Sequence, residues 1–306
     1  MLPQSIVRRL RKSVRRLGRY ASASSDDDVA AYLRNGRRPW SRGYESYKTS
    51  YIERSISDSS FLDRMARGEE LPAGHGEFLD ERVVEYPWFL SRVRNTGGRL
   101  LDAGSTLNQE FALEHPRLKG KDITIVTLAP EASCFWQKRI SYVFADIRDL
   151  PFRDNYFDHV VSISTIEHVA KDNAIYTSDR AFRENDGRGF LSAVRELKRV
   201  CKPGGKVYIT VPYGQYTDFG WYQQFDQALI DKLITEFAPD RVNESYFAYE
   251  GGGWRRTRKD ACGHLQGFDI HATKHRNPNS IRDYDPDFAA ASRGIAALEL
   301  WKESRS

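Results

Sequence analysis

Short apolar runs alternate with amphipathic segments through the middle of the chain. Each run is four to seven residues long, as buried strands are, and the segments between them carry apolar residues at wider steps. The runs cover residues 99–103, 122–128, 142–145, 158–164 and 206–211. This alternation predicts an α/β fold with a doubly wound, mostly parallel sheet.

Helical periods flank and separate these strands. Residues 189–201 have apolar side chains at three- and four-residue steps, and Lys202-Pro203-Gly204-Gly205 would end that helix. Residues 78–93 predict a second helix, which Pro87 should kink or divide into two. A further helix is expected after Pro130, directly behind the second strand.

The C-terminal part predicts one more helix and two closing strands. The helix covers residues 226–237, and the strands cover 245–249 and 296–301. The polar stretch between those strands, about 252–290, is longer than loops in compact domains usually are, which indicates a substrate cap or an insert.

The N-terminal tail has a different character. Residues 1–25 hold seven basic residues and no acidic one, and Ile6, Val7, Leu10, Val14 and Leu17 recur at helical steps between them. The pattern predicts a basic amphipathic helix, with residues 21–28 as a linker. Such a helix can lie on an anionic membrane surface, contact RNA or remain a solvated arm.

Composition narrows the class of protein. The 306 residues are 40% hydrophobic, which suffices for a packed core, and neither a membrane-spanning run nor a secretion signal is evident. The three cysteines lie far apart, which favours a reducing, cytoplasmic setting and argues against zinc, so no metal site is predicted. Outside the tail, 40 basic residues face 42 acidic ones, so a nucleic-acid partner is not expected.

Candidate chemistry gathers at the ends of the predicted strands. Asp146 follows the third strand, and the turn from Ser164 to His168 follows the fourth. Ligands of open parallel sheets bind beyond the carboxyl ends of the strands, so both turns should face one crevice. Gly104 follows the first strand, but the dinucleotide pattern GxGxxG is absent, which disfavours a nicotinamide or flavin enzyme.

Three motifs in this order resemble class I S-adenosylmethionine-dependent methyltransferases, most closely the type 11, ubiquinone-biosynthesis-like group. They are LLDAGS, FADIRDLPFRDNYFD and ELKRVCKPGGKVYITVP. The flanking DERVVEYPW and the Tyr- and Trp-rich C-terminal part look like an uncharacterised branch associated with polysaccharide assembly.

The resemblance implies a seven-stranded Rossmann-like methyltransferase sheet with an antiparallel last strand. It divides the chain into the tail and linker at 1–28, a helical N-terminal cap at 29–98, and a methyltransferase domain at 99–306 that contains the insert at about 252–290. The implied cofactor is S-adenosylmethionine.

Cofactor contacts carry over position by position from the resemblance. Asp102 and Gly104 fall where the family holds the methionine end, and Ser105 and Ser164 are adjoining candidates. Asp146 falls at the adenine amino group, with Ile147 packing on the ring. Thr127 occupies the place of the acid that usually holds the ribose hydroxyls, and Glu131 could compensate for it.

Two functions remain open at this stage. In the first, the chain methylates a sugar or glycan, which could be lipid-linked, with His168 as the base and Glu167 orienting it or contacting the cofactor. In the second, a non-catalytic relative is recruited to a membrane-associated biosynthetic complex, peripheral at the inner face. For His168 and Glu167, a purely structural role at a helix start is the alternative.

Aromatic residues and arginines supply the candidates for acceptor binding. Tyr86 and Trp88 could line the crevice from the preceding helix, although core packing is expected of each. Tyr213, Trp221 and Tyr222 follow the fifth strand, and Trp254 precedes Arg255, Arg256 and Arg258. Aromatic faces can stack on sugars, and arginines can pair with phosphates.

Overall fold

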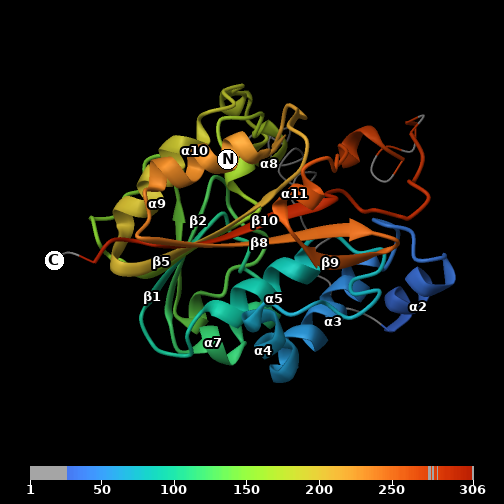
Figure 1. Cartoon of the computed structure of the whole chain (residues 1–306), viewed down its shortest axis with the longest axis horizontal. Coiled ribbons are helices and arrows are strands. Elements are labelled where there is room, and N and C mark those ends of the chain that lie inside the picture. Colours follow the sequence, from blue (N-terminus) through green and yellow to red (C-terminus); the bar gives the residue numbers. More distant parts are fainter. Residues whose placement is uncertain (1–25, 275–276, 278, 281, 305–306) are drawn as a thin grey trace, which may run out of the picture.

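A computed structural model describes residues 26–274, 277, 279–280 and 282–304. The predicted tail helix and most of the linker therefore lie outside the described residues. The chain folds into three layers, with a large sheet between two groups of helices (Figure 1).

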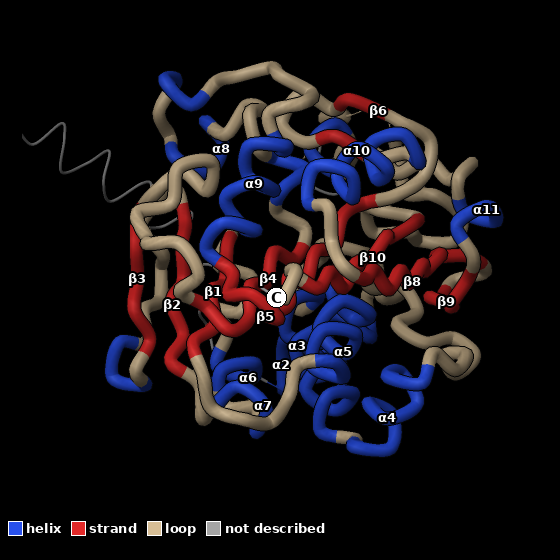
Figure 2. The backbone as a smooth tube through the Cα atoms, turned by 60° about the vertical axis from the view of Figure 1, so that its left-hand side comes forward, coloured by secondary structure: helices blue, strands red, loops and turns tan. Residues whose placement is uncertain are grey.

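Eight strands form the central sheet, in the order β3-β2-β1-β4-β5-β10-β8-β9. The first five in sequence run parallel, β10 runs antiparallel to both β5 and β8, and β9 runs antiparallel to β8. Figure 2 shows the strands side by side across the sheet. The strands are β1 (Arg99–Ala103), β2 (Asp122–Thr127), β3 (Ile140–Phe144), β4 (Phe157–Ile163), β5 (Cys201–Pro212), β8 (Arg241–Glu250), β9 (Gly253–Thr257) and β10 (Gly294–Trp301).

The mixed, mostly parallel sheet confirms the predicted fold class, but the strand count of seven was wrong. The eighth strand, β9, lies inside the predicted insert, where Tyr249 pairs with Trp254 across a tight hairpin. A separate two-stranded ribbon joins β6 (Thr217–Asp218) to β7 (Gln223–Gln224).

Helices cover both faces of the sheet. One face carries the longer helices of the N-terminal region, and the other carries α9 and α10 (Figures 1 and 2). The helices are α2 (Asp26–Arg34), α3 (Tyr44–Ser57), α4 (Ser59–Arg67), α5 (Arg82–Arg92), α6 (Glu110–Leu113), α7 (Pro116–Lys119), α8 (Ala174–Thr177), α9 (Phe190–Val200), α10 (Gln227–Phe237) and α11 (Lys259–Cys262).

Two cores result, one on each face of the sheet. Side chains alternate along a strand, so Leu100 joins the core under α3, α4 and α5, while Leu101 joins the core under α9 and α10. Burial on both faces explains why the parallel strands read as continuous apolar runs in the sequence.

One local prediction was wrong. The helix expected behind the second strand is absent, and only a short 3₁₀ turn, Trp136–Lys138, follows β2 there. Pro87 lies within α5, which is one helix, so of the two effects predicted for Pro87 the division into two helices does not occur. Among the described residues, no helix is long and apolar enough to cross a membrane.

Candidate active site

A cavity of about 570 Å³ opens beyond the carboxyl ends of β1, β2 and β4. It has the volume and the position expected of a ligand site in an open parallel sheet. Most of the candidates named from the sequence line it, namely Gly104, Ser105, Thr127, Asp146, Ile147, Ser164 and His168.

Gly104 lets the turn after β1 close tightly. Its φ is +124°, and a Cβ at this position would lie 2.1 Å from the Thr165 Oγ1. No other residue type fits there without displacing Thr165, because the left-handed φ and the close approach both exclude a side chain. The floor of the cavity therefore depends on this glycine.

Asp102 lies beneath the cavity and does not line it. Its side chain is fully buried, and its Oδ2 accepts a hydrogen bond of 2.8 Å from the Leu107 N–H. Burial raises the pKa of this carboxyl to about 7. In the described structure, Asp102 holds the turn that carries Gly104 and Ser105.

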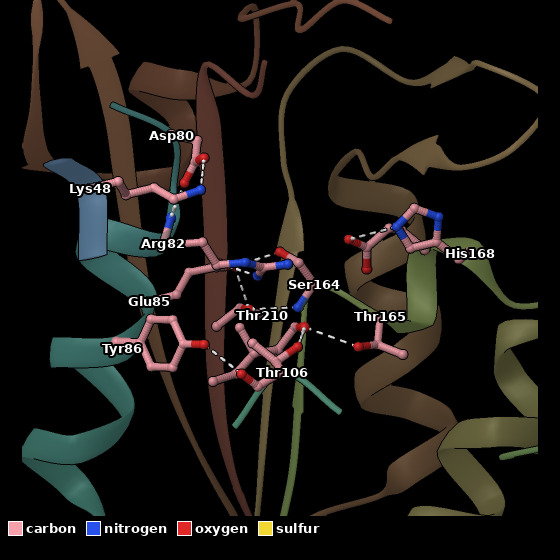
Figure 3. A network of polar contacts seen from close by, with 12 residues as sticks. Lys48, Asp80, Arg82, Glu85, Tyr86, Thr106, Ser164, Thr165, His168 and Thr210 are labelled. Carbon is pink, nitrogen blue, oxygen red and sulfur yellow. Dashed lines mark hydrogen bonds and ion pairs between the residues drawn. The ribbon is translucent and has the colours of Figure 1, made fainter. Parts of the chain in front are cut away.

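Helix α5 is tied to the same turn and to the end of β4. The Tyr86 hydroxyl donates to the Thr106 carbonyl. The Glu85 Oε1 accepts from the Ser164 Oγ at 2.5 Å and from the Thr210 Oγ1 at 2.6 Å, while its Oε2 meets the Arg82 Nη1 at 2.5 Å. Figure 3 shows this network between α5 and the strand ends.

Three charged side chains in the wall of the cavity form ion pairs with one another. Both carboxylate oxygens of Asp146 accept from the Arg148 guanidinium, with a shortest distance of 2.6 Å. Arg148 also donates to both carboxylate oxygens of Glu184, each at 2.6 Å. All three residues line the cavity, so Asp146 is already engaged by a neighbour at the position assigned to the adenine contact.

His168 is held in one orientation at the edge of the cavity. Its Nδ1 lies 2.9 Å from the carbonyl oxygen of Trp221, which can only accept, so Nδ1 carries the proton and Nε2 presents its lone pair. Burial lowers the pKa of His168 to about 4, so the imidazole is neutral at pH 7. The Glu167 Oε1 lies 3.8 Å from this Nε2.

A second cavity, of about 180 Å³, adjoins the first. The two share Arg82, Ser164, His168 and Tyr176 in their walls. The smaller one adds Glu81 and Glu167 with the rings of Trp221 and Tyr222. His168 therefore stands between a larger cavity and a smaller, partly aromatic one.

Residues 101–209 match a family model described as a methyltransferase domain. The matched span starts in β1 and ends within β5, and it includes the turns that form the larger cavity. This part of the chain is therefore similar to a methyltransferase domain. No curated protein sequence matches the chain.

Solved structures with a similar fold include proteins of several activities. The [4+2]-cyclase SpnF is 19% identical, with 80% of this chain and 93% of that chain covered and a TM-score of 0.45. Phosphoethanolamine N-methyltransferase 2 of Haemonchus contortus is 14% identical, with 83% and 59% covered and a TM-score of 0.46. 1,6-Didemethyltoxoflavin-N1-methyltransferase of Burkholderia thailandensis is 12% identical, with 93% of each chain covered and a TM-score of 0.40.

Several aromatic and basic candidates lie away from both cavities. Trp254 is buried, and its Nε1 donates to the Leu79 carbonyl at 2.9 Å. Trp88 and Tyr213 are buried in the two cores. Arg255 pairs with Glu250 at 2.6 Å, and Arg258 pairs with Asp260 at 2.9 Å. These contacts make Trp254 part of the structure around Leu79 rather than a surface for sugar stacking.

Sequence reasoning missed the acidic and basic residues that α5 brings to the site. Glu81, Arg82 and Glu85 belong to the DERVVEYPW segment, which suggested a helix and a resemblance but no roles for these residues. The available signal was a set of charges placed among apolar residues that must be buried. Buried charges are usually paired, so they indicate partners elsewhere in the fold.

Proposed function

We propose that the larger cavity binds S-adenosylmethionine and that the smaller cavity holds the acceptor. The fit of the cofactor rests on the volume of about 570 Å³ and on the tight turn at Gly104, where a side chain would clash with Thr165. Gly104 and Ser105 would face its methionine end, while Thr127 and Glu131 would face the ribose, and all four line the cavity.

His168 is the proposed base, and its position between the cavities is the observation that carries the proposal. When bound, the cofactor would supply a methyl group activated by the sulfonium, and loss of the carbon–sulfur bond would leave S-adenosylhomocysteine. His168 faces both cavities with an unprotonated Nε2, so it can take the proton of an acceptor hydroxyl as its oxygen bonds to the methyl carbon. Glu167 lies beside it and would position the acceptor.

A sugar hydroxyl is the proposed acceptor group. The rings of Trp221 and Tyr222 in the smaller cavity support this choice, because aromatic faces stack on sugars. The link to bacterial polysaccharide assembly rests on the resemblance of the flanking segments. The lipid-linked glycan rests on the aromatic residues and arginines of the C-terminal part. The membrane contact proposed for residues 1–25 concerns a part of the chain outside the described residues.

The first test is calorimetric binding of S-adenosylmethionine and S-adenosylhomocysteine to the whole chain. We expect micromolar binding that weakens at least tenfold in Asp146→Ala, because hydrogen bonds to a charged group are worth about 1.5–3 kcal/mol. Asp260→Ala, on the surface and outside both cavities, is the control. A folded chain that binds neither ligand would overturn the proposal.

Methyl transfer tests the role of His168. With a set of sugars as acceptors and labelled S-adenosylmethionine, His168→Gln should lower the rate of transfer about 10²–10⁴-fold, as general-base removal does, while cofactor affinity stays within a few-fold. An unchanged rate would remove His168 from the reaction.

One observation favours a second candidate, a non-catalytic methyltransferase-like protein recruited to a biosynthetic complex. Arg148 engages both oxygens of Asp146, and Thr127 stands where an acid would hold the ribose, so the adenosine end of the cavity offers fewer acceptors than expected. This candidate predicts no calorimetric binding of either ligand and retention of the chain on anionic vesicles through residues 1–25.

A further inference from the structure

The smaller cavity contains two carboxyl groups that are not paired with its basic residues. Lys48 pairs with Asp80 at 2.6 Å and with Glu45 at 2.9 Å, and Arg82 pairs with Glu85 at 2.5 Å. Glu81 and Glu167 also line the cavity, and within the described residues no Lys or Arg forms an ion pair with either of them. The cavity therefore carries a surplus of acid.

The Glu167 carboxyl is buried and lacks a hydrogen-bond partner at one oxygen. Its side chain is only 2% exposed, and within the described residues its Oε2 is fully buried without a hydrogen-bond partner. The Oε2 of Glu81 is likewise buried and has no hydrogen-bond partner within the described residues. Leaving a buried acceptor unpaired costs about 1–3 kcal/mol, so a donor that reached either oxygen would recover this cost.

Aromatic rings complete the wall around these carboxyl groups. Trp40, Trp221, Tyr222 and Phe268 line the same cavity, and of these Trp40 already meets Lys48 and Phe268 already meets Arg282. Aromatic faces attract cations, and a desolvated cation is held more strongly than an exposed one. Carboxylates and rings together suit an ammonium group better than a neutral hydroxyl.

We infer that the acceptor carries an amino group, which binds as an ammonium between Glu81 and Glu167, next to the hydroxyl that faces His168. This inference rests on the proposed function. The His168 Nε2 and the Glu167 Oε1 are 3.8 Å apart, a spacing suited to a hydroxyl and an ammonium on neighbouring carbons. A vicinal amino alcohol, such as a 2-amino sugar, is therefore the predicted acceptor class.

The pKa values of the two carboxyl groups are consistent with an ammonium ligand. Burial and the neighbouring carboxylates of Asp80 and Glu85 raise the pKa of Glu81 to about 7, and burial and Glu85 raise the pKa of Glu167 well above its usual range, although Arg82 opposes both shifts. At pH 6 the Glu81 carboxyl is therefore mostly neutral in the free cavity. An arriving ammonium would ionise it, and the carboxyl proton would leave to solvent.

The experiment is calorimetric titration of glucosamine and of glucose into the whole chain saturated with S-adenosylhomocysteine at pH 6. The two sugars differ only in the group at C2, which is an amino group in one and a hydroxyl in the other. We expect glucosamine to bind at least tenfold more tightly and, from titrations in buffers of different ionisation enthalpy, to release a proton on binding, whereas glucose should release none.

Glu167→Gln and Glu81→Gln assign the effect to the cavity. Each keeps the side-chain shape, and either should bring the preference for glucosamine close to unity and remove the proton release. Glu250→Gln, on the surface beside Arg255, should change neither quantity. A variant that keeps the full preference would overturn the assignment.

The titrations distinguish failure of the proposed cofactor site from failure of the amino-group assignment. A chain that does not bind S-adenosylhomocysteine contradicts the proposed function itself. A chain that binds it but treats the two sugars alike, whether both bind or neither does, contradicts the amino-group assignment and leaves the cofactor site standing.

Discussion

At the scale of single residues, Gly104 makes the strictest demand on the site. An alanine there would need a φ of +124° and would bring its Cβ to 2.1 Å from the Thr165 Oγ1. We expect Gly104→Ala to lower the free energy of unfolding by roughly 1–3 kcal/mol, the usual cost of such backbone strain, and to weaken cofactor binding.

Urea unfolding measures this cost, and the chain offers a matched control. Gly120 has a φ of −93°, and a Cβ there would have no neighbour within 4 Å. Gly120→Ala should change stability by less than about 0.5 kcal/mol. Equal effects of the two variants would show that the turn after β1 tolerates a side chain.

His168 predicts the pH dependence of methyl transfer. A base must be unprotonated, and burial lowers the pKa of His168 to about 4. The rate should therefore persist as pH falls through 6.5, where an ordinary histidine titrates, and decline only near pH 4. Rates of transfer from pH 4 to 8, at saturating cofactor, test this. An acid limb near pH 6.5 would show that His168 is not the base, or is not buried when the acceptor binds.

At the scale of elements, α5 connects the N-terminal helices to the site. The Tyr86 hydroxyl is the link to the β1 turn, through the Thr106 carbonyl. Tyr86→Phe removes one hydrogen bond and keeps the ring, so we expect a loss of about 0.5–1.5 kcal/mol in unfolding free energy and weaker binding of S-adenosylhomocysteine.

Calorimetry and urea unfolding of the same samples separate the two effects. Tyr216→Phe, at an exposed ring, is the control and should change neither. If Tyr86→Phe lost stability but kept full affinity, α5 would support the fold without shaping the cavity.

The elements also show where sequence reasoning succeeds and where it fails. The parallel strands were predictable because burial on both faces leaves continuous apolar runs. Strand β9 was missed because its sequence, GWRRT, begins with glycine and carries two arginines. Its pairing with β8 depends on a hairpin, and long polar stretches do not reveal such pairing.

The candidate site likewise has parts that the sequence predicts and parts that it does not. Asp146, Ser164 and His168 could be placed because the carboxyl ends of parallel strands share one edge of the sheet. The contact between Glu85 and Ser164 joins residues 79 positions apart, and the Arg148–Glu184 pair joins residues 36 positions apart. Contacts of this range depend on how helices and loops pack on the sheet, which periodicity does not specify.

At the scale of the whole molecule, a buried histidine and a buried aspartic acid make the free energy of unfolding depend on pH in opposite directions. Burial lowers the pKa of His159 to about 4, from 6.5 in the unfolded chain. The unfolded chain therefore binds the proton first, and stability is lost as pH falls from 6.5 to about 4. Burial raises the pKa of Asp102 from 3.8 to about 7, so stability from this group is lost as pH rises from 3.8 to about 7.

Two substitutions should expose these opposing contributions, because each removes one titration. Relative to the wild type, Asp102→Asn should gain stability as pH rises from 4 to 7, and it can still accept from the Leu107 N–H. His159→Gln should gain stability as pH falls from 6.5 to 4. Each slope should approach about 1.4 kcal/mol per pH unit at most. Urea unfolding at half-unit pH intervals measures both slopes. The pH ranges in which His159 and Asp102 titrate overlap, so their effects on stability partly cancel in the wild type. Between pH 4 and 6.5 the stability of the wild type should therefore change less with pH than that of either variant. If the stability of all three proteins changed with pH in parallel, neither group would be buried in the folded chain as described.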